Sequence, residues 1–120
     1  IFSLICYIMD NTQRTLVFTA TFNESENIEK LIKLINSQPY QLDILVIDDN
    51  SPDGTREIII SLQKNFKNLY LINRDKKLGL DTAHKHAYNY AILNKYDFLI
   101  TMDADLSHNP DDIGFFFRTS

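Results

Sequence analysis

The sequence holds a single cysteine, Cys6, which excludes a disulfide within the chain and any zinc site built from several cysteines. It also lacks an excess of basic residues, since 12 Lys and Arg stand against 16 Asp and Glu and the formal net charge is -4. General nucleic-acid binders present a basic surface, so the composition argues against that class. It leaves open a protein that binds a nucleotide through a divalent metal ion.

No apolar run reaches the roughly 20 residues that a membrane-spanning helix needs. The apolar start, residues 1–9, is much shorter, and neither a basic stretch nor a cleavage site marks it as a signal peptide. We expect residues 1–14 to be a leader, with Met9 as a candidate true start. The apolar run 115–117 is expected to lie in or just after a helix, and the chain is expected to be a fragment.

Four apolar runs of strand length alternate with three amphipathic segments in a chain of one-domain size, 120 residues. The predicted strands are residues 16–20, 42–47, 69–72 and 98–102. Strands that alternate with helices indicate a parallel sheet with right-handed crossovers, and hence an α/β doubly wound architecture.

Each predicted helix has an apolar face and a signal at its start. A capping box of Asn23 and Glu26 is expected to open the first helix, and Asp81 is expected to cap the third. The apolar positions are Ile28, Leu31, Ile32 and Ile35 in the first, Ile58, Ile59, Leu62 and Phe66 in the second, and Ala83, Ala87 and Ala91 in the third. The three alanines, four residues apart, would let the third helix pack closely on the sheet.

Acidic residues follow three of the predicted strands, at Glu24, at Asp48-Asp49, and at Asp103 and Asp105. The carboxyl ends of parallel strands meet at one edge of a sheet, where ligands of such folds bind. Because carboxylates crowded together repel one another, such an edge needs a cation or a ligand rich in donors. Asp103 and Asp105 suit Mg²⁺ or Mn²⁺ holding a diphosphate. The plainer alternative is that they form a solvated strand exit.

Further residues would complete a nucleotide-sugar site. Glu24 and Asp49 can accept hydrogen bonds from base and ribose, and Arg74 and Lys77 can neutralise phosphate oxygens. The amino ends of the helices after Gly54 and after Asp81 add partial positive charge. The histidine pair 84 and 86 lies two apart on a helix, which makes a poor metal pair.

Four segments occur in the order and spacing of the polyprenol-phosphate (dolichol-phosphate) mannosyltransferases, which are family 2 glycosyltransferases of the GT-A fold. They are Thr-Phe-Asn-Glu-Ser-Glu-Asn-Ile at 21–28, Asp-Asp-Asn-Ser-Pro-Asp-Gly-Thr at 48–55, Lys-Leu-Gly-Leu-Asp-Thr-Ala at 77–83 and Met-Asp-Ala-Asp-Leu-Ser-His-Asn-Pro at 102–110. The chain resembles this family over roughly residues 15–117. The resemblance implies a Rossmann-like GT-A fold in which residues 15–120 are the N-terminal nucleotide-sugar-binding part of one domain.

The resemblance also implies an activity: inverting, metal-dependent transfer of a hexose, mannose from GDP-mannose above all, to a polyprenyl monophosphate. Such an enzyme works peripherally at the cytoplasmic face of a membrane. By matching position, the nucleotide pocket would be lined by Ala20, Phe22, Glu24, Ile47, Asp48 and Asp49. Asp103 and Asp105 would be the catalytic pair and metal ligands, Ser107 a further metal contact, Ala104 a donor contact, and Arg74 and Lys77 phosphate contacts.

Three positions depart from the family pattern: Ala20 replaces a usual proline, Phe22 a usual tyrosine and Asp81 a usual glycine. Alternatives remain open, namely a catalytically incomplete nucleotide-sugar-binding fragment, or a family 2 enzyme that uses UDP-glucose or another donor. A response-regulator receiver domain fits less well because its acidic pair follows the first strand, whereas Asp48-Asp49 follows the second. A haloacid-dehalogenase-like phosphatase would carry its Asp-x-Asp motif early in the chain.

Overall fold

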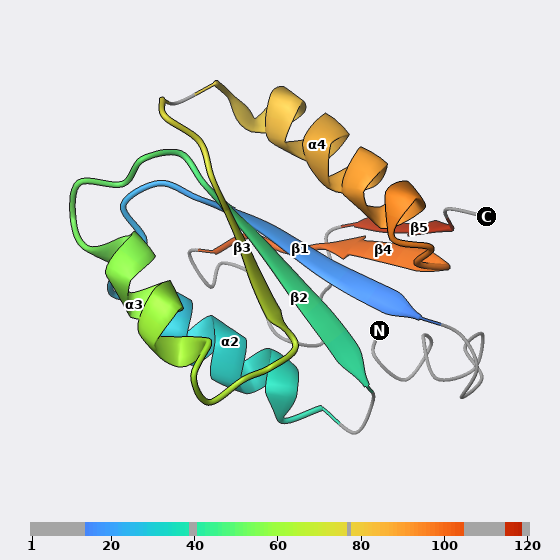
Figure 1. Cartoon of the computed structure of the whole chain (residues 1–120), viewed down its shortest axis with the longest axis horizontal. Helices are drawn as coiled ribbons and strands as arrows, with labels where there is room; N and C mark the ends of the chain where they lie inside the picture. The colour runs from blue at the N-terminus through green and yellow to red at the C-terminus, as the bar shows by residue number, and fades with distance from the viewer. Residues whose placement is uncertain (1–13, 39–40, 77, 105–114, 119–120) are drawn as a thin grey trace.

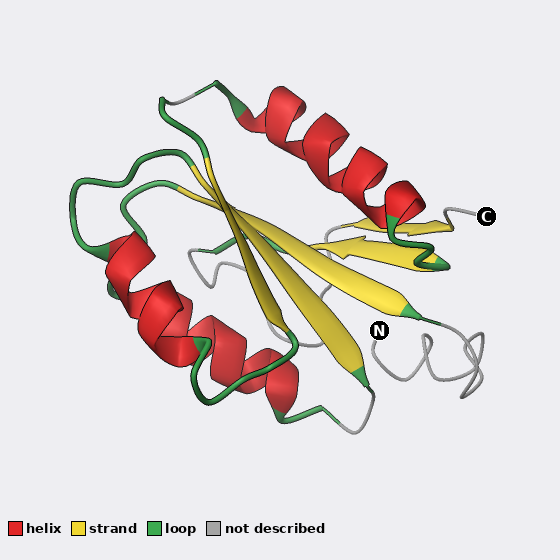
Figure 2. Cartoon of the chain, viewed as in Figure 1, coloured by secondary structure: helices red, strands yellow, loops and turns green. Residues whose placement is uncertain are grey.

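The strands form one five-stranded sheet in the order β3-β2-β1-β4-β5 (Figures 1 and 2). A computed structural model describes residues 14–38, 41–76, 78–104 and 115–118. The elements are β1 (Thr15–Thr21), α2 (Ile28–Asn36), β2 (Leu42–Asp48), α3 (Thr55–Leu62), β3 (Leu69–Asn73), α4 (Leu80–Leu93), β4 (Phe98–Thr101) and β5 (Phe115–Arg118). The predicted alternation of strands and helices is confirmed.

β1 is the central strand and pairs in parallel with both β2 and β4. Thr15 lies opposite Leu42 on one side and Phe98 on the other, and β3 extends the parallel set beyond β2. The four predicted strands therefore all run in one direction, as expected. Their carboxyl ends lie at the same edge of the sheet.

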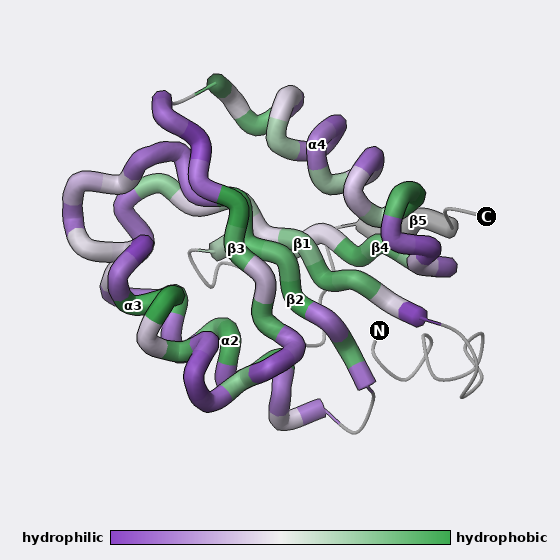
Figure 3. The backbone as a smooth tube through the Cα atoms, viewed as in Figure 1, coloured by the Kyte–Doolittle hydropathy of each residue, from purple (hydrophilic) through white to green (hydrophobic). Residues whose placement is uncertain are grey.

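Two apolar layers cover the sheet, with α2 and α3 on one face and α4 on the other (Figure 1). Successive residues of a strand point to opposite faces, so Val17 packs under α2 and α3 whereas Leu16 and Phe18 pack under α4. Hydrophobic segments accordingly follow the strands in Figure 3, and the loop that leaves β3 is hydrophilic.

The predicted helical faces are buried as expected. In α2 the apolar residues spaced i, i+3, i+4 and i+7 are at most 2% exposed, and in α4 Ala83, Ala87 and Ala91 are fully buried. Alanine keeps the helix backbone close to the sheet, because no longer side chain separates them. α3 ends at Leu62, so Phe66 lies beyond it, although its ring still packs on the core.

Two predicted helix starts are wrong. α2 begins at Ile28 with Asn27 as its N-cap, because residues 24–27 form a turn in which the N–H groups of Asn27 and Ile28 donate to the carbonyl of Glu24. Asn23 instead has a φ of 58°, which places it in the left-handed region. α4 begins one residue before Asp81, after the N-cap Gly79, so Asp81 lies in the first turn and is not the cap.

The expectation of a helix around residues 115–117 is also wrong. These residues belong to β5, which pairs antiparallel with β4 and places Phe116 opposite Ile100. An apolar run of three residues carries no helical period, and pairing with a neighbouring strand decides its structure. Among the described residues, no helix has the length and apolar character needed to cross a membrane.

Candidate functional site

Polar side chains gather where β1, β2 and β4 end. Thr21 closes β1 directly opposite Asp48, the last residue of β2, and on the other side the N–H of Met102 donates to the carbonyl of Phe18. Asp49 and Asp103 follow these strand ends on either side of β1. The parallel sheet therefore brings Asp49 and Asp103 to one edge, although 54 positions separate them along the chain.

Asp48 is fully buried and joins the loops that follow β1 and β2. Its carboxylate accepts hydrogen bonds from the Thr21 hydroxyl at 2.7 Å, from the Ser51 hydroxyl at 2.6 Å and from the Ser51 N–H at 3.0 Å. A buried carboxylate is stable only when such donors surround it. Asp48 thus holds the end of β1 and the turn after β2 together.

The turn after β2 also binds the backbone of the loop after β1. Three consecutive N–H groups of that loop each donate to a different side chain of the turn or of Thr55, the first residue of α3. Asn23 donates to the Ser51 hydroxyl at 2.9 Å, Glu24 to the Thr55 hydroxyl at 3.0 Å, and Ser25 to the Asp53 carboxylate at 3.1 Å. We call this set of three bonds the loop clip. It holds the segment that carries Glu24 against the end of β2.

Asp53 anchors one end of the loop clip. Besides the bond from Ser25, it accepts from both the N–H and the hydroxyl of Thr55, at 3.1 and 2.5 Å. Desolvation acts to raise the pKa of this carboxyl, but the hydrogen bonds from Thr55 and Ser25 outweigh it and lower the pKa to about 2. Gly54, next in the chain, has a φ of 92°, which an L side chain rarely adopts and glycine adopts readily.

Asp49 forms a nearly buried ion pair with Arg74, whose backbone N–H also binds the carbonyl of Asp48 at 2.8 Å. The guanidinium binds in a fork, with Nε donating to Oδ1 and Nη2 donating to Oδ2 at 2.8 Å. The two side chains are only 10% and 8% exposed. Such bidentate pairing fixes the orientation of the carboxylate as well as its charge.

The same guanidinium connects Asp49 to the start of α4. Its Nη1 donates to the Thr82 hydroxyl at 2.9 Å and its Nη2 to the carbonyl of Gly79 at 3.3 Å. An arginine side chain has five N–H donors. The two bonds to Asp49 and the bonds to Thr82 and Gly79 together use four of them. Arg74 therefore links the ends of β2 and β3 to the amino end of α4.

The other predicted nucleotide-binding residues differ in exposure. Glu24 is partly buried, Phe22 is 37% exposed, and Ala20 is partly buried beside the core under α4. Ile47 is fully buried in that core, and Ala104 is buried in the core under α2 and α3. Asp103 is exposed.

Some predicted residues lie outside the described residues, namely Lys77, Asp105, Ser107 and the neighbouring His108. Within the described ranges, no group of three or more His, Cys, Asp or Glu side chains is arranged to hold a metal ion. The ring of His84 packs edge-on against Phe18 with centroids 5.4 Å apart, which gives this histidine a packing role.

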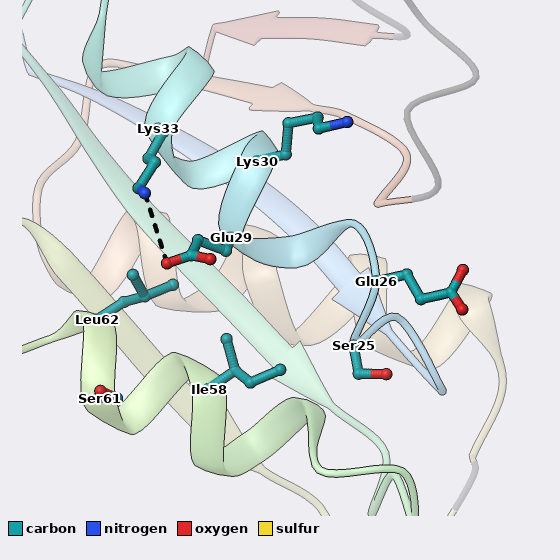
Figure 4. A pocket seen from close by; sticks show the side chains of 8 residues that line it. All are labelled: Ser25, Glu26, Glu29, Lys30, Lys33, Ile58, Ser61 and Leu62. Carbon is teal, nitrogen blue, oxygen red and sulfur yellow. Dashed lines mark ion pairs between the residues drawn. The ribbon is translucent and has the colours of Figure 1, made fainter.

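Pockets lie on both helical layers. One, of about 460 Å³, runs between α2 and α3, with Ile58 and Leu62 on one side and Glu29, paired with Lys33 at 3.5 Å, on the other (Figure 4). The second, of about 450 Å³, lies along α4. Neither is lined by Asp48, Asp49 or Asp103, so both are separate from the acidic edge.

Several residues of the site were not singled out by the sequence: Thr21, Ser51, Asp53, Thr55 and Thr82 support it without being predicted ligands. A signal was present in the alternation of short polar residues at 51, 53 and 55 around a proline and a glycine. Ser, Asp and Thr in a turn bind nearby backbone groups. Such a pattern indicates a turn, but it does not indicate that the side chains of the turn bind another loop.

Together, the parallel sheet, the helices on both faces and the acidic carboxyl edge define an α/β domain of the nucleotide-sugar transferase type, with the GT-A fold. Residues 16–117 match the family described as Glycosyl transferase family 2. The chain belongs to glycosyl transferase family 2.

Two curated relatives are similar to most of this chain. It is 36% identical over 103 residues to the polyprenol monophosphomannose synthase of Mycolicibacterium smegmatis, a match that covers 85% of this chain and 39% of the relative. It is 31% identical over 100 residues to the undecaprenyl-phosphate mannosyltransferase of Micrococcus luteus, covering 83% and 41%. The chain therefore spans about two fifths of the length of these relatives.

A solved structure supports the same fold. The mannosyltransferase PcManGT from Pyrobaculum calidifontis, solved in complex with GDP-Man and Mn²⁺, superposes with a TM-score of 0.70 at 27% sequence identity. The match covers 77% of this chain and 27% of that one. The resemblance to family 2 glycosyltransferases that the four sequence segments indicated is confirmed.

Proposed function

We propose that this chain is the nucleotide-sugar-binding part of an inverting, metal-dependent glycosyltransferase that moves mannose from GDP-mannose to a polyprenyl monophosphate. The observation that carries this proposal is the common edge at which β1, β2 and β4 end, with Glu24, Asp49 and Asp103 at the strand ends. The names of the two curated relatives support the acceptor, and the complex of PcManGT supports the donor.

Asp49 and Glu24 are assigned to the nucleoside. The carboxylate of Asp49, oriented by Arg74, keeps lone pairs with which to accept N–H donors from a base. Glu24 stands on the neighbouring loop and is assigned to base or ribose donors, with Phe22, Ala20 and Ile47 shaping the pocket. Direct contact is assigned to Asp49, because Asp48 already accepts from Thr21 and Ser51.

A divalent ion fits the residues after β4. Mg²⁺ in such sites is bound by one or two carboxylates together with phosphate oxygens and water. Asp103 and Asp105 therefore supply enough protein ligands, and the Ser107 hydroxyl is a further metal contact. When bound, the ion supplies charge neutralisation to the departing nucleoside diphosphate. Lys77 is assigned to the same phosphates, as is the one guanidinium N–H of Arg74 not used by its contacts with Asp49, Thr82 and Gly79.

The reaction itself needs little proton transfer. A polyprenyl phosphate is already ionised at neutral pH, so its oxygen attacks the anomeric carbon of the sugar without a strong general base. One displacement breaks the bond to the nucleoside diphosphate and inverts the configuration. The residues of the acidic edge then act by holding the donor and its leaving group in place. A lipid acceptor requires the enzyme to work at a membrane, and peripheral action at the cytoplasmic face is part of this proposal.

The test is a thermal-shift series with Mn²⁺ and GDP-mannose, UDP-glucose or no nucleotide, repeated with a chelator. Ligand at about a hundredfold over its dissociation constant should stabilise the protein by roughly 2.7 kcal/mol. Asp105→Ala should abolish the metal-dependent shift and keep the melting transition, whereas Glu57→Ala, at an exposed site on α3, should change neither. A shift with UDP-glucose alone would exclude GDP-mannose as donor. No shift with either nucleotide would contradict the proposed function.

A further inference from the structure

The loop clip constrains a segment that belongs to neither a strand nor a helix. Residues 23–25 lie between the end of β1 and the start of α2, and their N–H groups donate to the side chains of Ser51, Thr55 and Asp53. On the other side, the carbonyl of Glu24 accepts from the N–H groups of Asn27 and Ile28. Glu24 is therefore fixed through both of its backbone polar groups.

Thr55 lies at the centre of this arrangement and is fully buried. Its hydroxyl donates its one proton to Asp53 and accepts the N–H of Glu24, so the group is used as donor and as acceptor at once. Ser51 repeats the pattern, since its hydroxyl donates to Asp48 and accepts the N–H of Asn23. Each hydroxyl thus links an aspartate side chain to the backbone of the neighbouring loop through two hydrogen bonds.

We infer that Thr55 is a positioning residue for nucleotide binding, which acts by holding the backbone of Glu24 in the conformation that presents its side chain to the ligand, with Asp53 as its support. This inference rests on the proposed function, in which Glu24 contacts the nucleoside. A loop fixed before the ligand arrives loses little further conformational freedom on binding. Loosening it should therefore weaken affinity even though neither Thr55 nor Asp53 touches the nucleotide.

A purely structural role would give a different pattern. Thr55 begins α3, so loss of its hydroxyl also affects the start of that helix and lowers the melting temperature. Such a loss of stability does not by itself change the affinity of the folded protein for a nucleotide. The dissociation constant, measured well below the melting temperature, separates the two roles.

The first experiment compares Thr55→Val, which keeps the shape and removes the hydroxyl, with Thr55→Ser, which keeps the hydroxyl. The exchange rate of the Glu24 amide hydrogen, measured by NMR without any ligand, reports whether the loop is still held. Exchange should accelerate by about tenfold in Thr55→Val, because the amide loses its acceptor, and should stay near the wild-type rate in Thr55→Ser. The matched control, Ser61→Ala, removes an exposed hydroxyl from the same helix and should leave Glu24 unchanged.

The second measurement is the dissociation constant of GDP with Mn²⁺, by calorimetry on the same variants. Affinity should fall by about tenfold in Thr55→Val, while Thr55→Ser and Ser61→Ala stay within about twofold of wild type. Faster exchange at Glu24 with unchanged affinity would overturn the positioning role. Unchanged exchange in Thr55→Val would overturn it as well, because the bond would then hold nothing.

A further variant covers the case in which Thr55→Val fails to fold. Asp53→Asn, at an exposed position, replaces one carboxylate oxygen with an NH₂ group that cannot accept a hydrogen bond; the oxygen that stays can keep the two bonds from Thr55, so the bond from Ser25 is the one lost. It should accelerate exchange at Ser25 and weaken GDP binding, whereas the matched loss of charge in Glu57→Gln should do neither. Wild-type protein that binds no GDP or UDP contradicts the proposed function and, with it, the nucleotide role of Thr55. The exchange rates still decide separately whether the loop is held.

Discussion

Replacement of Arg74 by methionine removes the charged partner of Asp49 while keeping a side chain of similar length. The carboxylate of Asp49 is 10% exposed, so the variant leaves a nearly buried charge without its partner. Breaking a buried ion pair by removing one member costs about 3–5 kcal/mol, and the bonds to Thr82 and Gly79 are lost too. We therefore expect the free energy of unfolding to fall by about 3 kcal/mol or more.

The assay is urea unfolding at pH 7, followed by circular dichroism, on wild type, Arg74→Met, Asp49→Asn and the double variant. Because the two side chains contact each other, their effects should not add, and the coupling energy should reach about 2 kcal/mol. Arg74→Lys keeps a charge but not the fork, so it should lose an intermediate amount of stability.

Lys33→Met serves as the matched control. It removes a lysine that pairs with Glu29 at 3.5 Å, but both side chains are more than half exposed, at 61% and 55%. Exposed pairs contribute roughly 0.5 kcal/mol or less, and salt screens them. If Arg74→Met loses no more stability than Lys33→Met, the reasoning from burial is refuted.

Three further outcomes are expected. Ala87→Leu should lower the free energy of unfolding by about 1–3 kcal/mol, because Ala87 is fully buried between α4 and the sheet, and the exposed Lys85→Leu on the same helix should change it little in the same urea titration. Asp53 has a pKa of about 2, below the 3.8 of the unfolded chain, so its ionised carboxylate stabilises the folded state above pH 4, and this stabilisation is lost as pH falls toward 2. The difference in melting temperature between wild type and Asp53→Asn should therefore shrink over that range. The pKa of Tyr96 is raised above 10, first by burial and then by the hydrogen bond that its hydroxyl donates to Asp43 at 2.6 Å. The stabilisation that this tyrosine gives the folded state is therefore complete below pH 10 and declines above it. Tyr96→Phe should remove about 1.5 kcal/mol at pH 7 and flatten that alkaline decline in thermal melts.

The sequence predicted the strands and the helical faces because hydrophobic period is a local property. The spacing of Ile28, Leu31, Ile32 and Ile35 specifies a buried face wherever the helix begins. Helix starts were harder to predict. Asn23 and Glu26 satisfy the capping-box spacing, but the N–H of Asn23 is bound by Ser51, 28 residues away, and the chain adopts a turn there before α2 begins.

The contacts that support the site could not be predicted for the same reason. The fork between Arg74 and Asp49 joins residues 25 apart, and the bond between Glu24 and Thr55 joins residues 31 apart. Sequence spacing reports neither contact, because both depend on which strands become neighbours. The acidic strand ends were predictable, since each follows its own apolar run and a parallel sheet collects such ends at one edge.

The position of β1 between β2 and β4 has a consequence for the order in which the protein folds. Thr15 and its partner in β2 are 27 residues apart, whereas Thr15 and its partner in β4 are 83 apart. Closing the longer loop costs roughly 1 kcal/mol more in chain entropy. During synthesis, moreover, β1, β2 and β3 leave the ribosome before β4 does. We expect residues 14–76 to assemble first around the loop clip, with Asp103 arriving last at an edge that is already shaped.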